Sequence, residues 1–196
     1  MDLNDALEAF DPVAHIFDEL GIEYQLGGSV ASSIYGFPRG TLDVDVQADI
    51  KEQHVKPLVE RLENEWMITT AMVREALRYR TSFNIIPVDD IAKIDIFVPK
   101  HTPFDISSSS RRAKDVVMVD GTVIPYYVDS LEDAILRKLQ WYRMGDHQID
   151  QKWLDVLAMI KAHVFDLDLE YLEKWAPELG ISDLLAKALD ESGFTE

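Results

Sequence analysis

The sequence contains no cysteine. This absence excludes disulfide bonds, a catalytic thiolate and a zinc site built on sulfur, and it is compatible with a reducing cytoplasm, where we expect the protein to work. Long apolar runs are also missing, because no stretch approaches the roughly 20 residues that cross a bilayer. The first residues are acidic where a secretory leader would be basic. We therefore expect a protein that is neither secreted nor membrane-spanning, with no membrane partner.

Basic residues are scarce: 19 lysines and arginines stand against 36 aspartates and glutamates, and the net charge is −17. This balance argues against a protein that coats nucleic acid in general, because phosphate backbones are bound by an excess of lysine and arginine. The middle of the chain nevertheless holds three basic groups: Arg74, Arg78 and Arg80; Arg111, Arg112 and Lys114; and Arg137, Lys138 and Arg143. Each group is consistent with a solvated face of mixed charge or with a site for an anionic ligand.

The pattern of the chain changes near residue 130. Before this point, short alternating stretches typical of strands are interspersed with helical ones, and after it the apolar spacing is helical throughout. We predict an α+β fold, with a mixed β-sheet and flanking helices in residues 1–129 and a C-terminal α-helical subdomain in residues 130–196. The 196 residues are 47% hydrophobic, which is typical of a packed soluble protein.

Periodicity, glycine breaks and turn residues predict the individual elements. Strands are expected at residues 22–26, 42–46, 66–72, 81–88 and 92–98, and residues 116–119 and 123–128 flank the hairpin signal Asp120-Gly121. Helices are expected at residues 3–20, from 29, and at 51–64, 131–145, 150–163, 168–176 and 182–191, whereas the serines at 107–110 are typical of a loop.

Three aspartates lie on expected strands. Because the side chains of a strand alternate between its faces, Asp43 and Asp45 project together, and the apolar residues around them face the other way. Asp95 is placed in the same way on its own strand. Three carboxylates on one sheet are the hard oxygen ligands that Mg²⁺, or Mn²⁺, prefers. An Asp-x-Asp pattern by itself is also typical of a solvated face on which lysines or arginines pair with the acids.

A second signal lies upstream, where Leu26-Gly27-Gly28-Ser29 joins an expected strand to an expected helix. Glycines at such a junction let the backbone approach a phosphate, and the helix N-terminus offers free N–H groups. An ordinary tight turn with Ser29 as the helix cap fits these residues equally. The sequence has neither a P-loop nor a dinucleotide-binding fingerprint, so neither of those nucleotide-binding folds is supported.

In combination, these residues resemble the DNA polymerase β-type nucleotidyltransferase superfamily, whose pattern is a Gly-Ser turn, an Asp-x-Asp strand and a distant third carboxylate. The resemblance covers residues 24–98 and continues more weakly through residues 138–153. A longer string is similar to the bacterial branch that includes abortive-infection and toxin–antitoxin nucleotidyltransferases: Gly27-Gly28-Ser29-Val30-Ala31-Ser32, Tyr35-Gly36, Pro38-Arg39, Thr41 and Asp43-Val44-Asp45.

The resemblance implies roles for these residues. Asp43, Asp45 and Asp95 would be catalytic and would hold the divalent ions, with Asp95 helping to deprotonate the attacking group. The residues that would bind the nucleotide are Gly27, Gly28, Ser29, Arg39, Lys138 and Asp150. Among them, Lys138 would also take part in catalysis by neutralising the triphosphate. A surface lysine of a helix and an aspartate that caps a helix are the alternatives for Lys138 and Asp150.

The activity implied is transfer of a nucleoside monophosphate from an NTP to an acceptor, with Mg²⁺ or Mn²⁺ as the cofactor. The acceptor would be RNA, such as a tRNA end, or a protein hydroxyl, with a small molecule also open, in a toxin–antitoxin pair or in phage defence. The alternative is a non-catalytic, antitoxin-like component that uses the same fold as a docking surface. A cognate toxin or antitoxin protein is therefore a further candidate partner.

Overall fold

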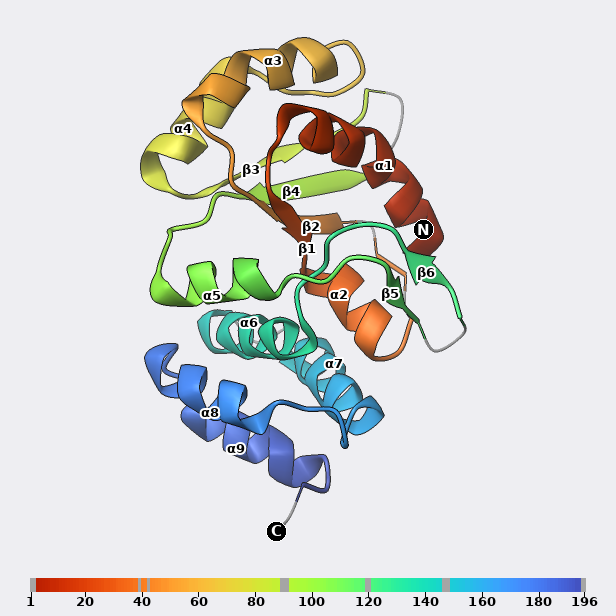
Figure 1. Ribbon diagram of the computed structural model, residues 1–196, viewed down its shortest axis with the longest axis vertical. Coiled ribbons are helices and arrows are strands. Elements are labelled where there is room, and N and C mark those ends of the chain that lie inside the picture. The colour runs from red at the N-terminus through yellow and green to blue at the C-terminus, as the bar shows by residue number, and fades with distance from the viewer. Residues whose placement is uncertain are drawn as a thin grey trace.

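The computed structural model describes residues 3–38, 40–41, 43–88, 92–118, 121–145 and 149–194, with only the backbone described at 149 and 150. Its central sheet has the strand order β1-β2-β4-β3 (Figure 1), made of Tyr24–Leu26, Asp43–Ala48, Lys93–Phe97 and Ser82–Ile85. Strands β2 and β4 are parallel, and the other two pairings are antiparallel. This arrangement confirms the predicted α+β fold with a mixed sheet.

One face of the sheet is apolar. Val44, Val46, Ile94 and Ile96 are fully buried on it. Helix α1 (Leu3–Leu20) packs against this face, with the ring of Phe10 at 5.6 Å from that of Tyr24 on β1. Figure 1 shows helices α3 (Glu52–Leu62) and α4 (Thr70–Tyr79) on the same side of the molecule as α1. Burial of this face fixes the strand register, because a shift by one residue would turn the aspartates into the core.

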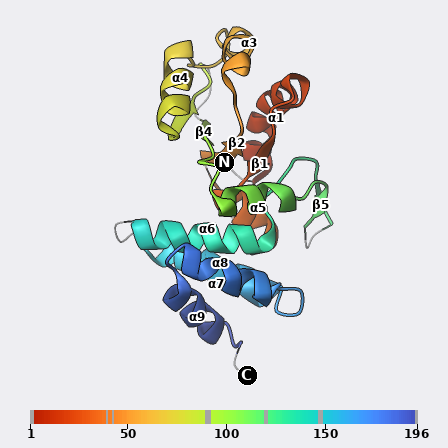
Figure 2. The same cartoon turned by 60° about the vertical axis from the view of Figure 1, so that its left-hand side comes forward.

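The other face of the sheet is polar and carries the aspartates. Helices α2 (Gly28–Tyr35), α5 (Pro103–Arg111) and α6 (Leu131–Met144) lie on this side (Figure 1). Figure 2 shows α6 stacked with α7 (Ile149–Ala162), α8 (Leu169–Glu178) and α9 (Ser182–Glu191), away from α3 and α4. None of the helices in the described part of the chain is long and apolar enough to cross a membrane.

The helical part of the chain begins at Ser130, whose hydroxyl caps α6 by accepting the N–H of Asp133 at 3.2 Å. From α6 onward every element is helical over the described residues. The division of the chain into two units at this position stays a prediction.

The strand expected at residues 66–72 is wrong. Trp66 forms only an isolated bridge with Pro87, and α4 begins at Thr70. The hydroxyl of Thr69 caps this helix by accepting the N–H of Met72 at 3.2 Å. Val73 and Ala76 lie three residues apart on α4, and both are buried. The apolar spacing of this segment is therefore helical, and it begins later than the run of residues that suggested a strand.

The loop expected at residues 107–110 is also wrong, because these serines form the last turns of α5. Thr102 and Asp105 form a reciprocal capping box, and Pro103 occupies the first turn. Ser108 is fully buried and accepts hydrogen bonds from Gln25 at 2.9 Å and from Arg137 at 3.0 Å. Tertiary contacts therefore decide the structure of a run whose composition favours a loop.

The expected hairpin is present but short: β5 (Val116–Val117) pairs antiparallel with β6 (Val123–Ile124). Residues 119 and 120 lie outside the described part of the chain. The chain then leaves the hairpin and runs beside β1, where Val128 bridges both Leu26 and Ala113. This segment brings Asp129 to the polar face of the sheet.

Candidate functional site

The turn at Gly27 and Gly28 is hydrogen-bonded to strand β2, which carries Asp45. Gly27 donates its N–H to the carbonyl of Asp45 at 2.9 Å, and α2 begins at the next residue. Gly28 has φ +53°, and a Cβ built there would lie 1.9 Å from Oδ2 of Asp45. The backbone N–H of Ser29 hydrogen-bonds the same carboxylate. Only glycine fits at residue 28, because both the left-handed backbone and the packed carboxylate exclude a side chain.

The second part of the site is the pair of parallel strands β2 and β4. Their register sets Asp45 opposite Asp95 and Asp43 opposite Lys93. The carboxylates therefore lie side by side on the polar face, as the alternation of each strand predicts. Burial and the neighbouring charge of Asp95 raise the pKa of Asp45 to about 6, although the Ser29 N–H and the charge of Lys138 oppose this shift.

Lys93 compensates two of these aspartates. Its Nζ lies 2.8 Å from a carboxylate oxygen of Asp95 and 3.4 Å from one of Asp43. The hydrogen bond to Asp95 raises the pKa of the Lys93 ammonium. In the described part of the chain, no group of three or more histidine, aspartate or glutamate side chains is arranged so that it could hold a metal ion. The resident cation of the cluster is thus the ammonium itself.

The donor set nonetheless suits a divalent cation. Asp43, Asp45 and Asp95 offer hard oxygens from adjacent positions of one sheet face. Burial, and then the charge of Asp95, raises the pKa of Asp45, and a bound cation would favour the ionised form of this carboxyl. The ammonium of Lys93 marks the place where a cation is stabilised, and its side chain is partly exposed and carried on a flexible stem. A metal ion would have to displace this ammonium from Asp43 and Asp95.

Lys138 reaches the site from below the glycine turn. Its Nζ lies 2.5 Å from Asp155, 2.7 Å from the hydroxyl of Ser32 and 3.4 Å from the carbonyl of Gly28. The residue is only 4% exposed, so the alternative of a helix-surface lysine is wrong. Its charge still acts on Asp45, whose pKa it lowers.

Two of the predicted nucleotide-binding residues are not placed. Arg39 lies outside the described part of the chain, and so does the side chain of Asp150 on α7. Among the described side chains of α7, Asp155 joins the site, and the sequence reasoning missed it. Asp155 accepts hydrogen bonds from Lys138 and from Gln151. The sequence around Asp155 gave no indication of this role, because Asp155 meets Lys138 only when α7 packs against α6.

A second charge pair, of the buried Asp129 and the partly buried Arg137, borders Asp45, and Asp129 was also missed. Asp129 accepts a hydrogen bond from Gln25 at 2.6 Å and lies 3.4 Å from Nε of Arg137. Burial raises the pKa of Asp129 to about 6, and the positive charge of Arg137 limits the shift. The basic group around residue 137 was a sequence signal for one of these partners, but nothing in the sequence marked Asp129.

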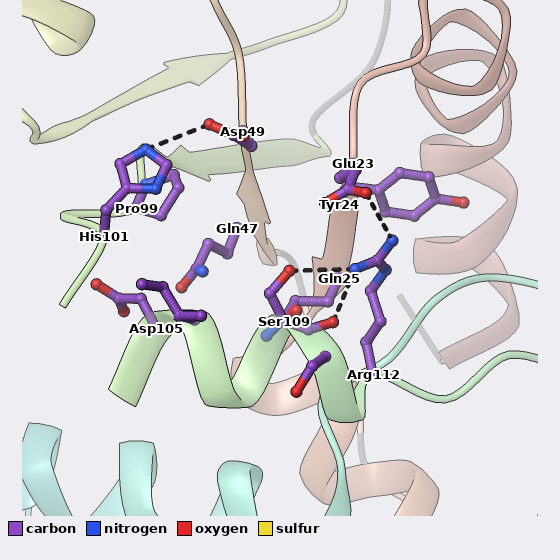
Figure 3. A pocket seen from close by; sticks show the side chains of 12 residues that line it. Glu23, Tyr24, Gln25, Gln47, Asp49, Pro99, His101, Asp105, Ser109 and Arg112 are labelled. Atoms are coloured by element: carbon purple, nitrogen blue, oxygen red, sulfur yellow. Dashed lines mark hydrogen bonds and ion pairs between the residues drawn. The ribbon is translucent and has the colours of Figure 1, made fainter. Parts of the chain in front are cut away.

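Two cavities lie near these charged residues on the polar face of the sheet. The small one, of about 100 Å³, lies beside Asp45 and is also lined by Arg137 and the half-buried Trp141. A larger one, of about 390 Å³, lies between the sheet and α5, with Gln25 and Gln47 pointing toward it (Figure 3). The space directly beside Asp45 is therefore small, and the larger space lies farther along β2 near Gln47 and Asp49.

Comparison with known proteins shows the fold. No protein-family model matches the chain, and no curated protein matches it. An antigenic nucleotidyltransferase-like protein from Paracoccidioides brasiliensis is 16% identical, with a TM-score of 0.57 over 97% of this chain and 94% of that one. The antibiotic-resistance factor ANT(2'')-Ia is 14% identical, with a TM-score of 0.50 over 98% and 90%. The chain therefore has the fold of nucleotidyltransferase-like proteins.

Proposed function

We propose that the protein is a metal-dependent nucleotidyltransferase that moves a nucleoside monophosphate from an NTP to the hydroxyl of an acceptor. The observation that carries this proposal is the contact between the Gly28 turn and Asp45, with Asp95 in register beside them. It sets a helix N-terminus that would bind phosphate against the carboxylates that would hold a metal. The nucleotidyltransferase-like fold supports the same activity.

In this proposal the carboxylates of Asp43, Asp45 and Asp95 hold Mg²⁺ or Mn²⁺. The metal supplies charge stabilisation for the attacking oxygen and for the leaving pyrophosphate. Gly27, Gly28 and Ser29 present backbone N–H groups and a hydroxyl to the terminal phosphates, with Arg39 and Asp150 as further nucleotide-binding residues.

The reaction is an in-line displacement. The acceptor oxygen forms a bond to the α-phosphorus, and the bond from this phosphorus to the bridging oxygen of the β-phosphate breaks, so that pyrophosphate leaves. Asp95 accepts the proton of the acceptor hydroxyl. Lys138 contributes its positive charge from beneath the glycine turn, where it lies close to the carbonyl of Gly28.

The acceptor in this proposal is RNA, such as a tRNA end, or a protein hydroxyl. The same residues could also transfer the nucleotide to the hydroxyl of a small molecule. A setting in the cytoplasm, in a toxin–antitoxin pair or in phage defence, follows from the similarity of the glycine and aspartate string to that bacterial branch. A cognate toxin or antitoxin would then be a protein partner.

The test is transfer of label from each α-labelled NTP in a bacterial lysate with Mg²⁺, followed by treatment with RNase or protease. We expect Asp45→Asn to reduce transfer by at least about 10³-fold, because it removes a metal-binding charge. Asp183→Asn is the matched control, since Asp183 lies on α9 and pairs with Arg143 on the surface. Equal labelling by the Asp45 variant would exclude this site as the catalytic centre.

A second candidate function rests on Lys93. An ammonium that already bridges Asp43 and Asp95 would suit an antitoxin-like protein whose acidic site no longer binds metal. Equilibrium dialysis with labelled ATP distinguishes the two functions. Binding of ATP that depends on Mg²⁺ supports the enzyme, whereas a stable protein partner without any such binding supports the docking component.

A further inference from the structure

Three neighbouring cavities follow β2 and the segment after it, and together we call them the β2 groove. The cavity beside Asp45 shares Gln25 and Gln47 with the larger cavity under α5. The larger cavity in turn shares Asp49 and His101 with a third cavity of about 430 Å³ next to α4. Residues 45 and 49 are four positions apart on an extended chain, a span of about 13 Å. The groove therefore leads from the carboxylates to a second, separate end.

The middle of the β2 groove is polar with its charges compensated. Glu23 lies 3.3 Å from Arg112, and Asp49 lies 3.4 Å from His101 and 3.7 Å from Lys51 (Figure 3). Carboxamides and serine hydroxyls make up much of the remaining lining, together with a few apolar groups. Such a lining suits an uncharged ligand that offers hydrogen-bonding edges and flat apolar faces.

The far end of the groove carries surplus positive charge. Four of the lining residues are basic: Lys51, Arg74, Arg78 and Arg80. Lys51 pairs with Asp49, and Arg74 pairs with Glu52 at 2.8 Å. Within the described residues, Arg78 and Arg80 form no ion pair with a carboxylate, and Arg80 donates only to the carbonyl of Pro99 at 3.3 Å.

This excess is unusual for a chain with a net charge of −17. An anion can enter because the arginines are exposed, and the N-terminus of α3 faces the same cavity through Lys51 and Glu52. Tyr79, which is 61% exposed, lies next in the chain to Arg78, whose guanidinium is 5.5 Å from the centre of its ring. An exposed aromatic ring beside arginines is a surface on which a base can stack.

We propose that the β2 groove binds the end of a single-stranded nucleic acid. A backbone phosphate would lie at Arg78 and Arg80, the next bases would lie in the middle of the groove, and the terminal hydroxyl would reach Asp45 and Asp95. This assignment rests on the proposed nucleotidyl transfer and names its acceptor class. A protein hydroxyl or a cationic small molecule would leave the two arginines without an anionic partner.

The test is fluorescence anisotropy of a labelled single-stranded RNA of about twelve nucleotides, a length within the range of such sites, titrated in EDTA at several salt concentrations. We expect Arg78→Glu to weaken binding about tenfold and Arg78→Ala to lower the dependence of log K on log[salt] by about one phosphate contact. Arg78→Lys should restore most of the affinity. Lys187→Glu on the distant helix α9 makes the same change of charge and should leave binding within about twofold.

Equal affinity of the unmodified protein and Arg78→Glu would overturn the assignment. Binding of ATP that depends on Arg78, without any such effect on RNA, would also overturn it, because the basic end would then be a site for a free nucleotide. A DNA strand of the same sequence shows whether the 2′-hydroxyl contributes.

The outcomes for the groove and for the proposed function are separable. Asp45→Asn should abolish transfer and should not weaken RNA binding in EDTA as Arg78→Glu does, because the proposed phosphate contact lies at the other end of the groove. Loss of RNA affinity in Arg78→Glu without transfer by the unmodified protein would support the groove and contradict the activity. Transfer to a protein or a small molecule with no effect of Arg78→Glu would support the activity and contradict the groove.

Discussion

Two lysines serve the polar face of the sheet, and they differ in burial. Lys138 and its partner Asp155 are 4% and 7% exposed, whereas the side chain of Lys93 is 33% exposed, between Asp43 and Asp95. A buried pair cannot lose one member without leaving a charge in a medium of low polarity. A partly exposed pair can exchange its cation for one from solvent at little cost. Lys138 is therefore a fixed part of the site, whereas Lys93 is replaceable.

The largest expected effect is loss of one member of the buried pair. Asp155→Ala should lower the free energy of unfolding by about 3–5 kcal/mol, because it removes the carboxylate that pairs with the buried ammonium of Lys138. Urea denaturation measures this loss. The double variant Asp155→Leu with Lys138→Met should recover much of it, since neither charge of this pair remains.

The matched control is the surface pair of Arg143 and Asp183, for which Asp183→Ala should cost far less stability than Asp155→Ala, because both partners are exposed to solvent. A loss of similar size in the two alanine variants would remove the distinction between the buried and exposed pairs.

An intermediate effect is expected at Asp45, whose ionised carboxylate is destabilised by burial and by the negative charge of Asp95. Because its pKa is about 6 in the folded protein, above the ordinary 3.8, the stability that it contributes is full below about pH 4 and is lost as the pH rises toward 6. The Asp45→Asn variant has no carboxyl to ionise at this position, so it does not lose stability as the pH rises. At neutral pH the metal-free variant should therefore be more stable than the unmodified protein by about 1–2 kcal/mol.

The measurement is urea denaturation in EDTA across this pH range. The advantage of Asp45→Asn should vanish near pH 4, where the carboxyl of the unmodified protein is protonated. A variant that is less stable than the unmodified protein at neutral pH would show that Asp45 is adequately compensated without metal. By the same reasoning, metal affinity should fall as the pH drops below about 6, because protons compete for Asp45.

The smallest effect on stability, and the one that probes the exposed pair directly, is expected for Lys93→Met. Loss of this ammonium should change the free energy of unfolding by less than about 1 kcal/mol. It should also tighten Mn²⁺ binding about three- to tenfold, because the ion no longer displaces a resident cation from Asp43 and Asp95. Electron paramagnetic resonance of free Mn²⁺ reports this affinity without catalysis. Weaker binding in the variant would mean that Lys93 supports the metal instead of competing with it.

Local patterns predicted the parts of this structure that depend on one element at a time. Alternation in each strand sets Asp43, Asp45 and Asp95 on one face, and the mixed sheet with a helical C-terminal part is confirmed. What could not be predicted depends on pairs of elements. The register that brings Lys93 opposite Asp43 exists only once β2 and β4 pair, and Asp155 meets Lys138 only once α7 packs on α6.

Both misassigned segments are helical because residues upstream cap a helix there. Thr69 caps α4. The serines of α5 are helical because Thr102 and Asp105 cap the helix and because Ser108 is buried against Gln25 and Arg137. The roles of the site residues in binding metal and nucleotide stay predictions, and so do those of Arg39 and Asp150.

The close contact of Gly28 and Asp45 makes these two positions interdependent in any descendant of this sequence. An oxygen of the carboxylate fills the space that a side chain at residue 28 would need. A larger residue at 28 can therefore be accepted only after Asp45 has moved or been lost, and Gly28→Ala should be less harmful when Asp45 is already alanine. In other chains of this fold, a side chain at this turn would indicate that the adjoining carboxylate has been given up.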